Sequence, residues 1–293
     1  MEEDQVSQDN RVSTVLGRRL GGELLNLRLA AELTQGQAAK AISASTAKVA
    51  KMERGWVPMR DPDIRVLCEL YGLDSPERLG GLLELARLDR ERRKAKGWWA
   101  DAPMSPKMRE YVGLEAAATS IRVWQLALIP GLFQTADYVS ALRRDAVRES
   151  KPEEDAAVVA SRLERQRRLH EDPPLRFWAV IHEAALRHVV GGRVVMRAQL
   201  ENLARLSSKP NITIQVMPFS AGAHPLMSNA FNILSFAEAG AMDVVYQETV
   251  FARLWVEGGD GAADFVELFD RVAARALSET KSRDLINAIH EEL

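Results

Sequence analysis

Small and polar residues recur at helical spacing between Thr34 and Gly55, in the stretch TQGQAAKAISASTAKVAKMERG. Thr34 and Ser45 are of the types that cap helix N-termini, and glycine is typical just after a helix. The pattern predicts a short helix, a turn, and a second helix that starts after Ser45 and turns Val49 and Met52 inward. Two capped helices joined by a short turn are what entry into the major groove of DNA requires.

Four residues of the second helix are expected to face the edges of DNA bases: Thr46, Ala47, Ala50 and Lys51. A threonine hydroxyl or methyl can contact a base, an alanine can rest against a thymine methyl, and a lysine can reach a guanine or bind a phosphate instead. The helix offers no arginine or asparagine for a bidentate contact. We therefore expect modest specificity per half-site, with DNA shape and dimer spacing supplying the rest.

Other residues around the two helices are better placed for phosphates, which fix the register without reading sequence: Gln35, Ser43, Ser45, Lys48, Arg54, Arg18 and Arg19. The alternative for each basic residue is an ordinary solvated face. Residues 11–60 hold nine basic and three acidic side chains, a net +6, so the rest of the chain sums to −8. A basic segment on an acidic body fits a protein that docks on DNA through one end.

The stretch resembles the helix-turn-helix of the XRE/Cro family, whose pattern TQ-x-x-LA-x-x-x-G-x-S-x-x-x-I-S-x-x-E-x-G aligns without a gap. Ser43 stands where the turn glycine is usual, so a non-glycine residue is expected in a left-handed turn at a modest cost. The resemblance implies a five-helix repressor-type domain that binds double-stranded DNA, and regulators of this type usually act as homodimers on two-fold sites. The matching positions are Thr34, Gln35, Ala39, Ser45, Val49, Glu53 and Gly55.

The length of 293 residues suggests two domains. We expect a flexible N-terminal arm at 1–12, a helix-turn-helix domain at 13–89, a charged and tryptophan-containing linker at 90–107, and an α+β regulatory or dimerisation domain at 108–293. A lone cysteine, Cys68, predicts a core thiol in a reducing cytoplasm. No apolar run approaches 18 residues and the N-terminus is acidic, so no membrane segment or signal peptide is predicted.

The second half predicts about five strands with helices around them, so the fold class is mainly α with an α+β C-terminal domain. The spacing from Tyr111 through Ile121 to Trp124 predicts an amphipathic helix. The adjacent Trp98 and Trp99 are expected to dock the linker onto the second domain or a partner chain. The strand candidates are residues 175–181, 212–217, 231–236, 243–247 and 251–256.

The second half also resembles a domain of unknown function that follows the same helix-turn-helix in actinobacterial regulators. The residues that carry this likeness are Glu115, Ile121 and Arg122, then PGLFQT at 130–135 and HEAALR at 182–187. The resemblance implies a transcriptional regulator whose C-terminal domain is modulated by a small partner protein. It transfers no catalytic residue.

Two other functions stay open for the second half. Asp243, Glu248 and Glu257 lie near strand ends, where a nuclease could use them, although acids are common at any sheet edge. The loop at 222–227 (GAHPLM) and the two tryptophans could instead line the pocket of a small-molecule sensor. His182 lacks a second histidine at ligand spacing. We therefore expect no enzyme, and no catalytic, cofactor-binding or metal-binding residue is assigned.

Overall fold

The computed structural model describes residues 14–94, 97–100, 102, 104–144, 152–237, 243–249, 253–257 and 259–293. The chain divides into two units, residues 1–97 and 98–293, and each is described by itself. The expected arm at 1–12 lies outside the described residues.

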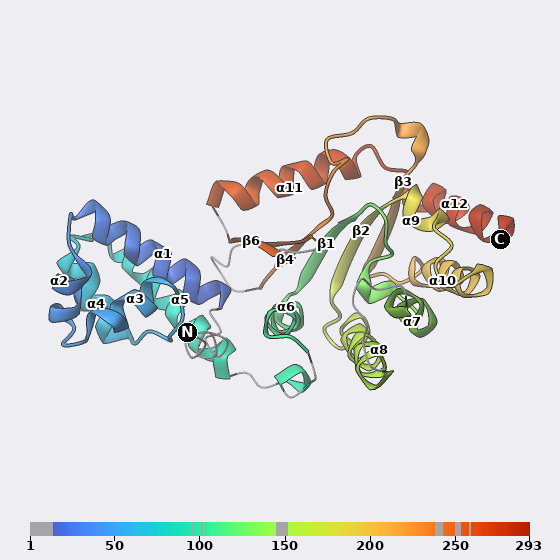
Figure 1. Ribbon diagram of the computed structural model, residues 1–293. Coiled ribbons are helices and arrows are strands. Elements are labelled where there is room, and N and C mark those ends of the chain that lie inside the picture. The colour runs from blue at the N-terminus through green and yellow to red at the C-terminus, as the bar shows by residue number, and fades with distance from the viewer. Residues whose placement is uncertain are drawn as a thin grey trace, which may run out of the picture. The chain divides into compact units, whose positions relative to one another are not determined.

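The first unit folds its described residues into five helices around one apolar core, as the sequence predicts (Figure 1). Leu20, Leu24, Ile64 and Leu67 are fully buried there, since each recurs at helical spacing on the inward face of its helix. The helices are α1 (Val15–Ala30), α2 (Gln35–Ala41), α3 (Thr46–Glu53), α4 (Asp61–Leu70) and α5 (Pro76–Lys94).

The predicted helix ends are confirmed by the backbone. Thr34 and Ser45 cap α2 and α3 with their hydroxyl oxygens. Gly55 follows α3 with φ at +67°, and a side chain there would overlap the backbone of Arg18 on α1. Only glycine combines this left-handed conformation with so close an approach of two chain segments.

The single cysteine is buried in this core on α4, and burial raises the pKa of the Cys68 thiol to about 11. Because the thiolate is the reactive form, we expect a disulfide reagent at pH 8 to label the native protein about a hundredfold more slowly than the unfolded chain. Absorbance of the released thiol would measure both rates. Equal rates before and after denaturation would show that Cys68 is accessible in the native protein.

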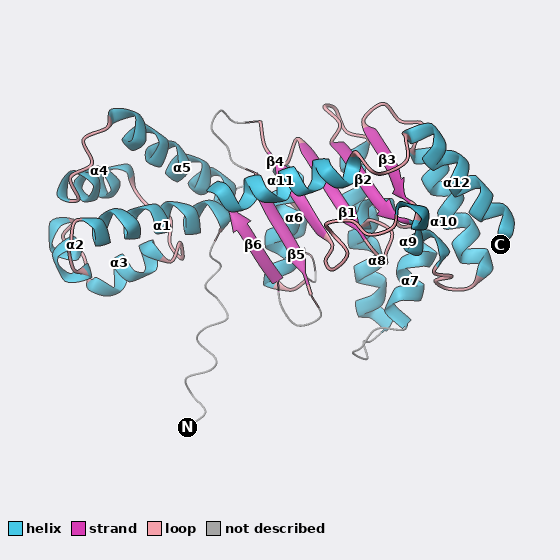
Figure 2. Cartoon of the chain, turned by 90° about the horizontal axis from the view of Figure 1, so that it is seen from above, coloured by secondary structure: helices cyan, strands magenta, loops and turns pink. Residues whose placement is uncertain are grey.

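The second unit is built on a six-stranded mixed sheet in the order β3-β2-β1-β4-β5-β6. The first three strands in this order are parallel, and β4, β5 and β6 add antiparallel. Figure 2 shows them side by side. The strands are β1 (Ser120–Gln125), β2 (Arg176–His182), β3 (Ile212–Met217), β4 (Phe231–Ser235), β5 (Val244–Glu248) and β6 (Arg253–Glu257).

Helices cover both faces of this sheet (Figure 1). One face packs Trp124, Val180 and Met217 against α11 (Gly259–Ala273), which crosses the strands in Figure 2. The opposite face is covered by α6 (Pro106–Ala117), α7 (Ala136–Arg144) and α8 (Pro152–Gln166). The remaining helices are α9 (Glu183–Arg187), α10 (Arg193–Leu206) and α12 (Glu279–Glu292).

The predicted amphipathic helix through Ile121 and Trp124 is wrong in its second half. The helix α6 ends at Ala117, and β1 follows as a strand at the centre of the sheet, so the described sheet has six strands rather than five. Ile121 and Val123 are buried on one face and Trp124 on the other, because a central strand is covered on both sides. Its apolar residues happen to continue the three-residue spacing of α6.

Of the two tryptophans, Trp99 docks within the second unit and Trp98 is exposed. They form a short 3₁₀ helix, η1 (Trp98–Ala100), and Nε of Arg109 on α6 donates to the carbonyl oxygen of Trp99 at 3.2 Å. The ring of Trp99 lies over Gly113, where a Cβ atom would come within 3.3 Å of its Nε1. The loop at 222–227 packs elsewhere, since Leu226 joins the core beneath α11. The expectation that these two segments line one pocket is therefore wrong.

Candidate nucleic-acid interface

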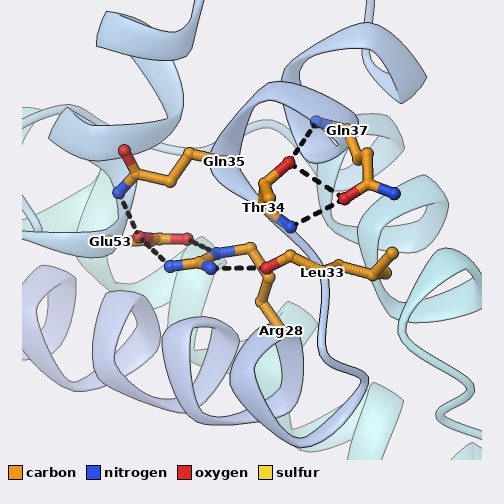
Figure 3. Close-up of polar contacts among 6 residues, drawn as sticks. All are labelled: Arg28, Leu33, Thr34, Gln35, Gln37 and Glu53. Atoms are coloured by element: carbon orange, nitrogen blue, oxygen red, sulfur yellow. Dashed lines mark hydrogen bonds and ion pairs between the residues drawn. The ribbon is translucent and has the colours of Figure 1, made fainter.

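The turn between α2 and α3 takes the shape that its sequence predicts. At the start of α2, the Thr34 hydroxyl accepts from the amide of Gln37 at 3.3 Å, and Oε1 of Gln37 accepts from the amide of Thr34 at 2.9 Å (Figure 3). This reciprocal capping box fixes where the helix begins. Ser43 adopts φ of +51° in the turn, which confirms the expected left-handed residue.

Three helices are tied together by one carboxylate, that of Glu53 at the end of α3 (Figure 3). Its Oε1 accepts from Nε of Arg28 on α1 at 2.5 Å, and its Oε2 accepts from Nη2 of Arg28 at 3.0 Å. Oε2 also accepts from the side-chain amide of Gln35 on α2 at 2.7 Å. Arg28 donates further to the carbonyl oxygen of Leu33 at 2.7 Å. We call Arg28, Gln35 and Glu53 the Glu53 cluster.

The two charged members of the Glu53 cluster are buried, and Gln35 is half-buried. Arg28 is 6% exposed and Glu53 8% exposed. The hydrogen bond to Glu53 raises the pKa of Arg28 above its ordinary value, against the opposing effect of burial. A fork-to-fork pair of this kind has one geometry, so it fixes the orientation of α3 relative to α1 and α2.

α3 also approaches α1 closely at Gly21, which has no side chain to keep the two helices apart. A Cβ atom on Gly21 would overlap the carbonyl oxygens of Met52 and Glu53, so α1 and α3 pack backbone against backbone at this point. Val49 and Met52 complete the contact from α3, each 1% exposed. The inner face of α3 is thus fixed by apolar packing and by the Glu53 cluster together.

The opposite face of α3 carries the predicted base-contacting residues. Thr46 and Ala47 are exposed, and Ala50 and Lys51 are half-buried. Positions 46, 47, 50 and 51 share one side of a helix with 3.6 residues per turn, while 49, 52 and 53 share the other. The structure therefore brings these four residues together on an outward face whose first turn is open.

The residues predicted to contact phosphates differ in the exposure of their side chains. Ser43, Ser45 and Arg54 are exposed, whereas Lys48, Arg18 and Arg19 are half-buried. The guanidinium of Arg54 lies 4.9 Å from the centre of the Trp56 ring. The amide of Gln35 is engaged by Glu53, which leaves its backbone N–H at the start of α2 for an anion. These contacts with DNA stay predictions.

Lys48 is held by a buried carboxylate that sequence reasoning did not connect to it. Its Nζ lies 2.8 Å from Oδ2 of Asp63, and Nη2 of Arg60 lies 3.1 Å from Oδ1. Burial would raise the pKa of Asp63, but the hydrogen bonds from Lys48 and Arg60 outweigh it and lower that pKa. Asp63 thereby positions two cations beside the start of α3.

The cluster formed by Arg28 with Glu53 was also missed from the sequence. Glu53 occupies a fixed position of the XRE/Cro pattern, which could have signalled a structural role, but its partner on α1 lies 25 residues away. Arg28 belongs to the basic count of residues 11–60, yet its charge is neutralised inside the fold. Glu53 belongs to the same count, so the pair removes one charge of each sign and leaves the net charge of residues 11–60 at +6.

Among the described residues, no group of three or more His, Cys, Asp or Glu side chains is placed to hold a metal ion. No helix in the described ranges is long and apolar enough to cross a membrane.

The geometry of α2 and α3 defines a helix-turn-helix, the class of DNA-binding domain in which the second helix enters the major groove. Comparison with known families agrees, since residues 19–80 match a helix-turn-helix domain. Residues 108–288, more than half of the chain, match a domain of unknown function, DUF5753, and the chain belongs to that family. No curated protein and no solved structure matches the chain.

Proposed function

We propose that the protein is a sequence-specific transcriptional regulator that reads the major groove with α3. The observation that carries this proposal is that α3 has one exposed face and one face packed into the core. Thr46 and Ala47 at its first turn are open, while Val49, Met52 and Glu53 anchor its other side. The N-terminal turn of a recognition helix is the part that contacts base edges. The alignment with the XRE/Cro pattern supports the same assignment.

In this proposal the residues of the exposed face divide by the chemistry they offer. Thr46, Ala47, Ala50 and Lys51 read bases, through a hydroxyl, two methyl groups and an ammonium. Phosphates are bound by the surrounding side chains and by the start of α2, namely Gln35, Ser43, Ser45, Lys48, Arg54, Arg18 and Arg19. Lys48 shares its charge with Asp63, so it contributes less than an unpaired lysine would.

The protein acts on DNA as a homodimer in this account. One α3 has eight residues and presents few contacts, so two copies on half-sites about one helical turn apart are needed for useful specificity. Sedimentation at micromolar concentration tests this, and a monomer there would contradict it. Because chromosomal DNA is its target, we place its action in the cytoplasm.

We further propose that the second unit receives the regulatory signal, from a small partner protein or a ligand, and has no catalytic activity. The acids that a nuclease would need are divided between the two ends of β5. Asp243 precedes this strand and pairs with Arg122 at 2.7 Å, whereas Glu248 ends it. Glu257 lies opposite Val244, at the Asp243 end. Co-purification of one small protein with the full chain would support the partner; no effect of that protein on DNA binding would contradict it.

The proposed function is tested by selecting DNA fragments from a random pool with the full chain. We expect a two-fold motif to be enriched. The double variant Thr46→Ala with Lys51→Ala should discriminate at least about tenfold less between this motif and scrambled DNA, since each specific base contact contributes about 1–3 kcal/mol. Fluorescence anisotropy at fixed salt measures both affinities.

The same two substitutions on an exposed helix of the second unit provide the control. Thr280→Ala with Lys281→Ala changes exposed residues at the start of α12. This control should discriminate as the parent does. Unchanged discrimination by the α3 double variant would contradict the assignment of α3 as the reading helix.

A further inference from the structure

A cavity of about 380 Å³ lies within the second unit, on the sheet face opposite α11. Val123, Asn232 and Tyr246 form its floor, since they are cross-strand neighbours on β1, β4 and β5. The cavity continues past Gln125 and Glu248, at the carboxyl ends of β1 and β5. In open sheets with helices on both faces, ligands bind outside the carboxyl ends of strands, where the strand order reverses. Here the chain runs from β1 to β2 and β3, then returns to the other side of β1.

One wall of the cavity is the PGLFQT motif, which the proposed function leaves unexplained. Its 3₁₀ turn η2 (Gly131–Phe133) is fixed from outside. The carbonyl oxygen of Phe133 accepts from the side-chain amides of Gln199 and Asn202, both at 2.8 Å. The carbonyl oxygen of Gln134 accepts from Nε2 of Gln166 on α8 at 2.6 Å. The wall is therefore a preformed surface.

A buried ion pair forms the back of the cavity. Arg165 on α8 donates from Nε and Nη2 to the two carboxylate oxygens of Glu115 on α6, at 2.6 and 2.8 Å. Its guanidinium also lies 5.4 Å from the centre of the Tyr111 ring. This fork-to-fork geometry neutralises the charge of Arg165, so Arg165 is not available to a ligand as a free cation.

Arg162, one turn earlier on α8, also lines the cavity but lacks such a partner. Its guanidinium makes no hydrogen bond or ion pair with the described residues. Burial and the neighbouring Arg165 lower the pKa of Arg162 to about 10, against the opposing influence of Glu115, Tyr111 and Glu248. A cation that is partly desolvated beside another cation is stabilised when an anion binds it.

The guanidinium of Arg162 is accommodated by Gly131 of the PGLFQT motif. A Cβ atom at Gly131 would overlap Nη1 of Arg162. The glycine therefore lets the charged group lie against the motif's backbone at the cavity wall. This gives the glycine of the motif a physical role that its backbone angle does not require, since its φ is not positive.

The same wall contains one hydrogen-bond acceptor, Oε1 of Gln134, that has no donor among the described residues. Gln134 is buried, and its Nε2 donates to the carbonyl oxygen of Ile129 at 2.8 Å, which fixes the orientation of the amide. Its Oε1 has no hydrogen-bond donor among the described residues. A buried acceptor without a partner costs stability, so a donor supplied by a ligand would be favoured.

We propose that this cavity binds a small aromatic acid, with its anionic group on Arg162, a donor N–H or O–H on Gln134, and its ring over Tyr111 and Tyr246. The centres of these two rings, from α6 and β5, lie 4.6 Å apart. The volume suits a ligand of two or three aromatic rings. The binding site stands on this geometry alone, whereas its use as a regulatory signal rests on the proposed function.

The test uses two dyes that differ by one charge. Anilinonaphthalene sulfonate carries an anion, an N–H donor and aromatic rings, and phenylnaphthylamine has the same rings and donor without the anion. We expect one sulfonate dye per full-length chain, bound about tenfold more tightly than the neutral dye. Arg162→Met should weaken the sulfonate dye about tenfold and leave the neutral dye within about twofold. Dye fluorescence titration measures all four affinities.

Two further variants keep the test decisive. Arg167→Met removes an exposed arginine that directly follows α8 and pairs with Glu164 of α8, and this variant should bind both dyes as the parent does. Gly131→Ala leaves Arg162 in place but displaces its guanidinium, so it should weaken the sulfonate dye selectively. Equal affinities for the two dyes, several sites per chain, or an unchanged sulfonate affinity in Arg162→Met would each overturn the proposal.

These titrations contain no DNA, so their outcome is independent of the proposed function. Adding the sulfonate dye to the protein on its selected DNA then asks whether the cavity and α3 are coupled. Dye binding without any change in DNA affinity would keep the site and remove its regulatory role. Loss of DNA selection with retained dye binding would contradict the proposed function alone.

Discussion

Replacing Glu53 with alanine is expected to destabilise the first unit by about 3–5 kcal/mol, because it leaves the Arg28 guanidinium buried without an anion. It also removes the acceptor for Gln35, so α2 and α3 lose their common anchor. The chain has two units, so global unfolding need not be a two-state process. Hydrogen exchange of the backbone amides of α1 to α5, followed by mass spectrometry, measures the local free energy of unfolding.

The control for this variant is an exposed glutamate of the same unit. Glu69→Ala on α4 should change the free energy of opening by less than about 0.5 kcal/mol. The double variant Arg28→Met with Glu53→Leu should recover part of the loss, since it removes both buried charges. If the backbone amides of α1 to α5 are protected from exchange as well in Glu53→Ala as in Glu69→Ala, the Glu53 cluster does not stabilise the position of α3.

The second large effect is expected from Ala47→Glu, which places a negative charge on the outward first turn of α3. We expect the affinity for the selected DNA to fall about a hundredfold or more. A carboxylate there would be repelled by the hydrogen-bond acceptor atoms of the bases and by the negatively charged phosphates. The side chain of Ala47 is exposed, so protection of the unit against exchange should not change. Fluorescence anisotropy in one buffer of fixed salt measures the affinity.

Ala198→Glu adds the same charge to an exposed position on α10 of the second unit. It separates a local effect from a general effect of net charge and should lower the affinity by less than about threefold. Equal losses in the two variants would mean that net charge alone explains the result. Unchanged binding by Ala47→Glu would remove α3 from the interface.

The features of the first unit that the sequence could predict are local ones. Thr34, Ser45 and Gly55 mark helix ends through their own backbone preferences. Val49 and Met52 reveal the inner face of α3 by their spacing. Even the left-handed turn at Ser43 could be anticipated, because the XRE/Cro pattern that this stretch resembles has glycine there. Each of these inferences depends on residues within a few positions of one another.

The contacts that fix the site are not local, and the sequence did not predict them. Glu53 meets Arg28 across 25 residues, and Lys48 meets Asp63 across 15. An arginine on a predicted helix surface is indistinguishable, from its neighbours alone, from one that is buried in an ion pair. Only the packing of α1 against α3 decides between the two.

In the second unit the sequence pattern did not predict the strand β1, because its apolar residues happen to keep a helical spacing. Ile121 and Trp124 continue the three-residue spacing of the preceding helix, although they lie on opposite faces of a central strand. The cavity depends on that strand, because Val123 of β1 forms part of its floor. The PGLFQT motif could be found in the sequence, but its contact with Arg162 required the fold.

The most direct test of the reading helix uses the inert native cysteine. With Cys68 buried, Thr46→Cys introduces one accessible thiol on the outward face of α3. A matched variant, Ser208→Cys, introduces one on the exposed surface of the second unit. Saturation with the selected DNA should slow labelling of the first thiol about tenfold or more and leave the second unchanged, since a side chain in the major groove is covered. Full labelling of the Thr46→Cys protein on saturated DNA would contradict this account.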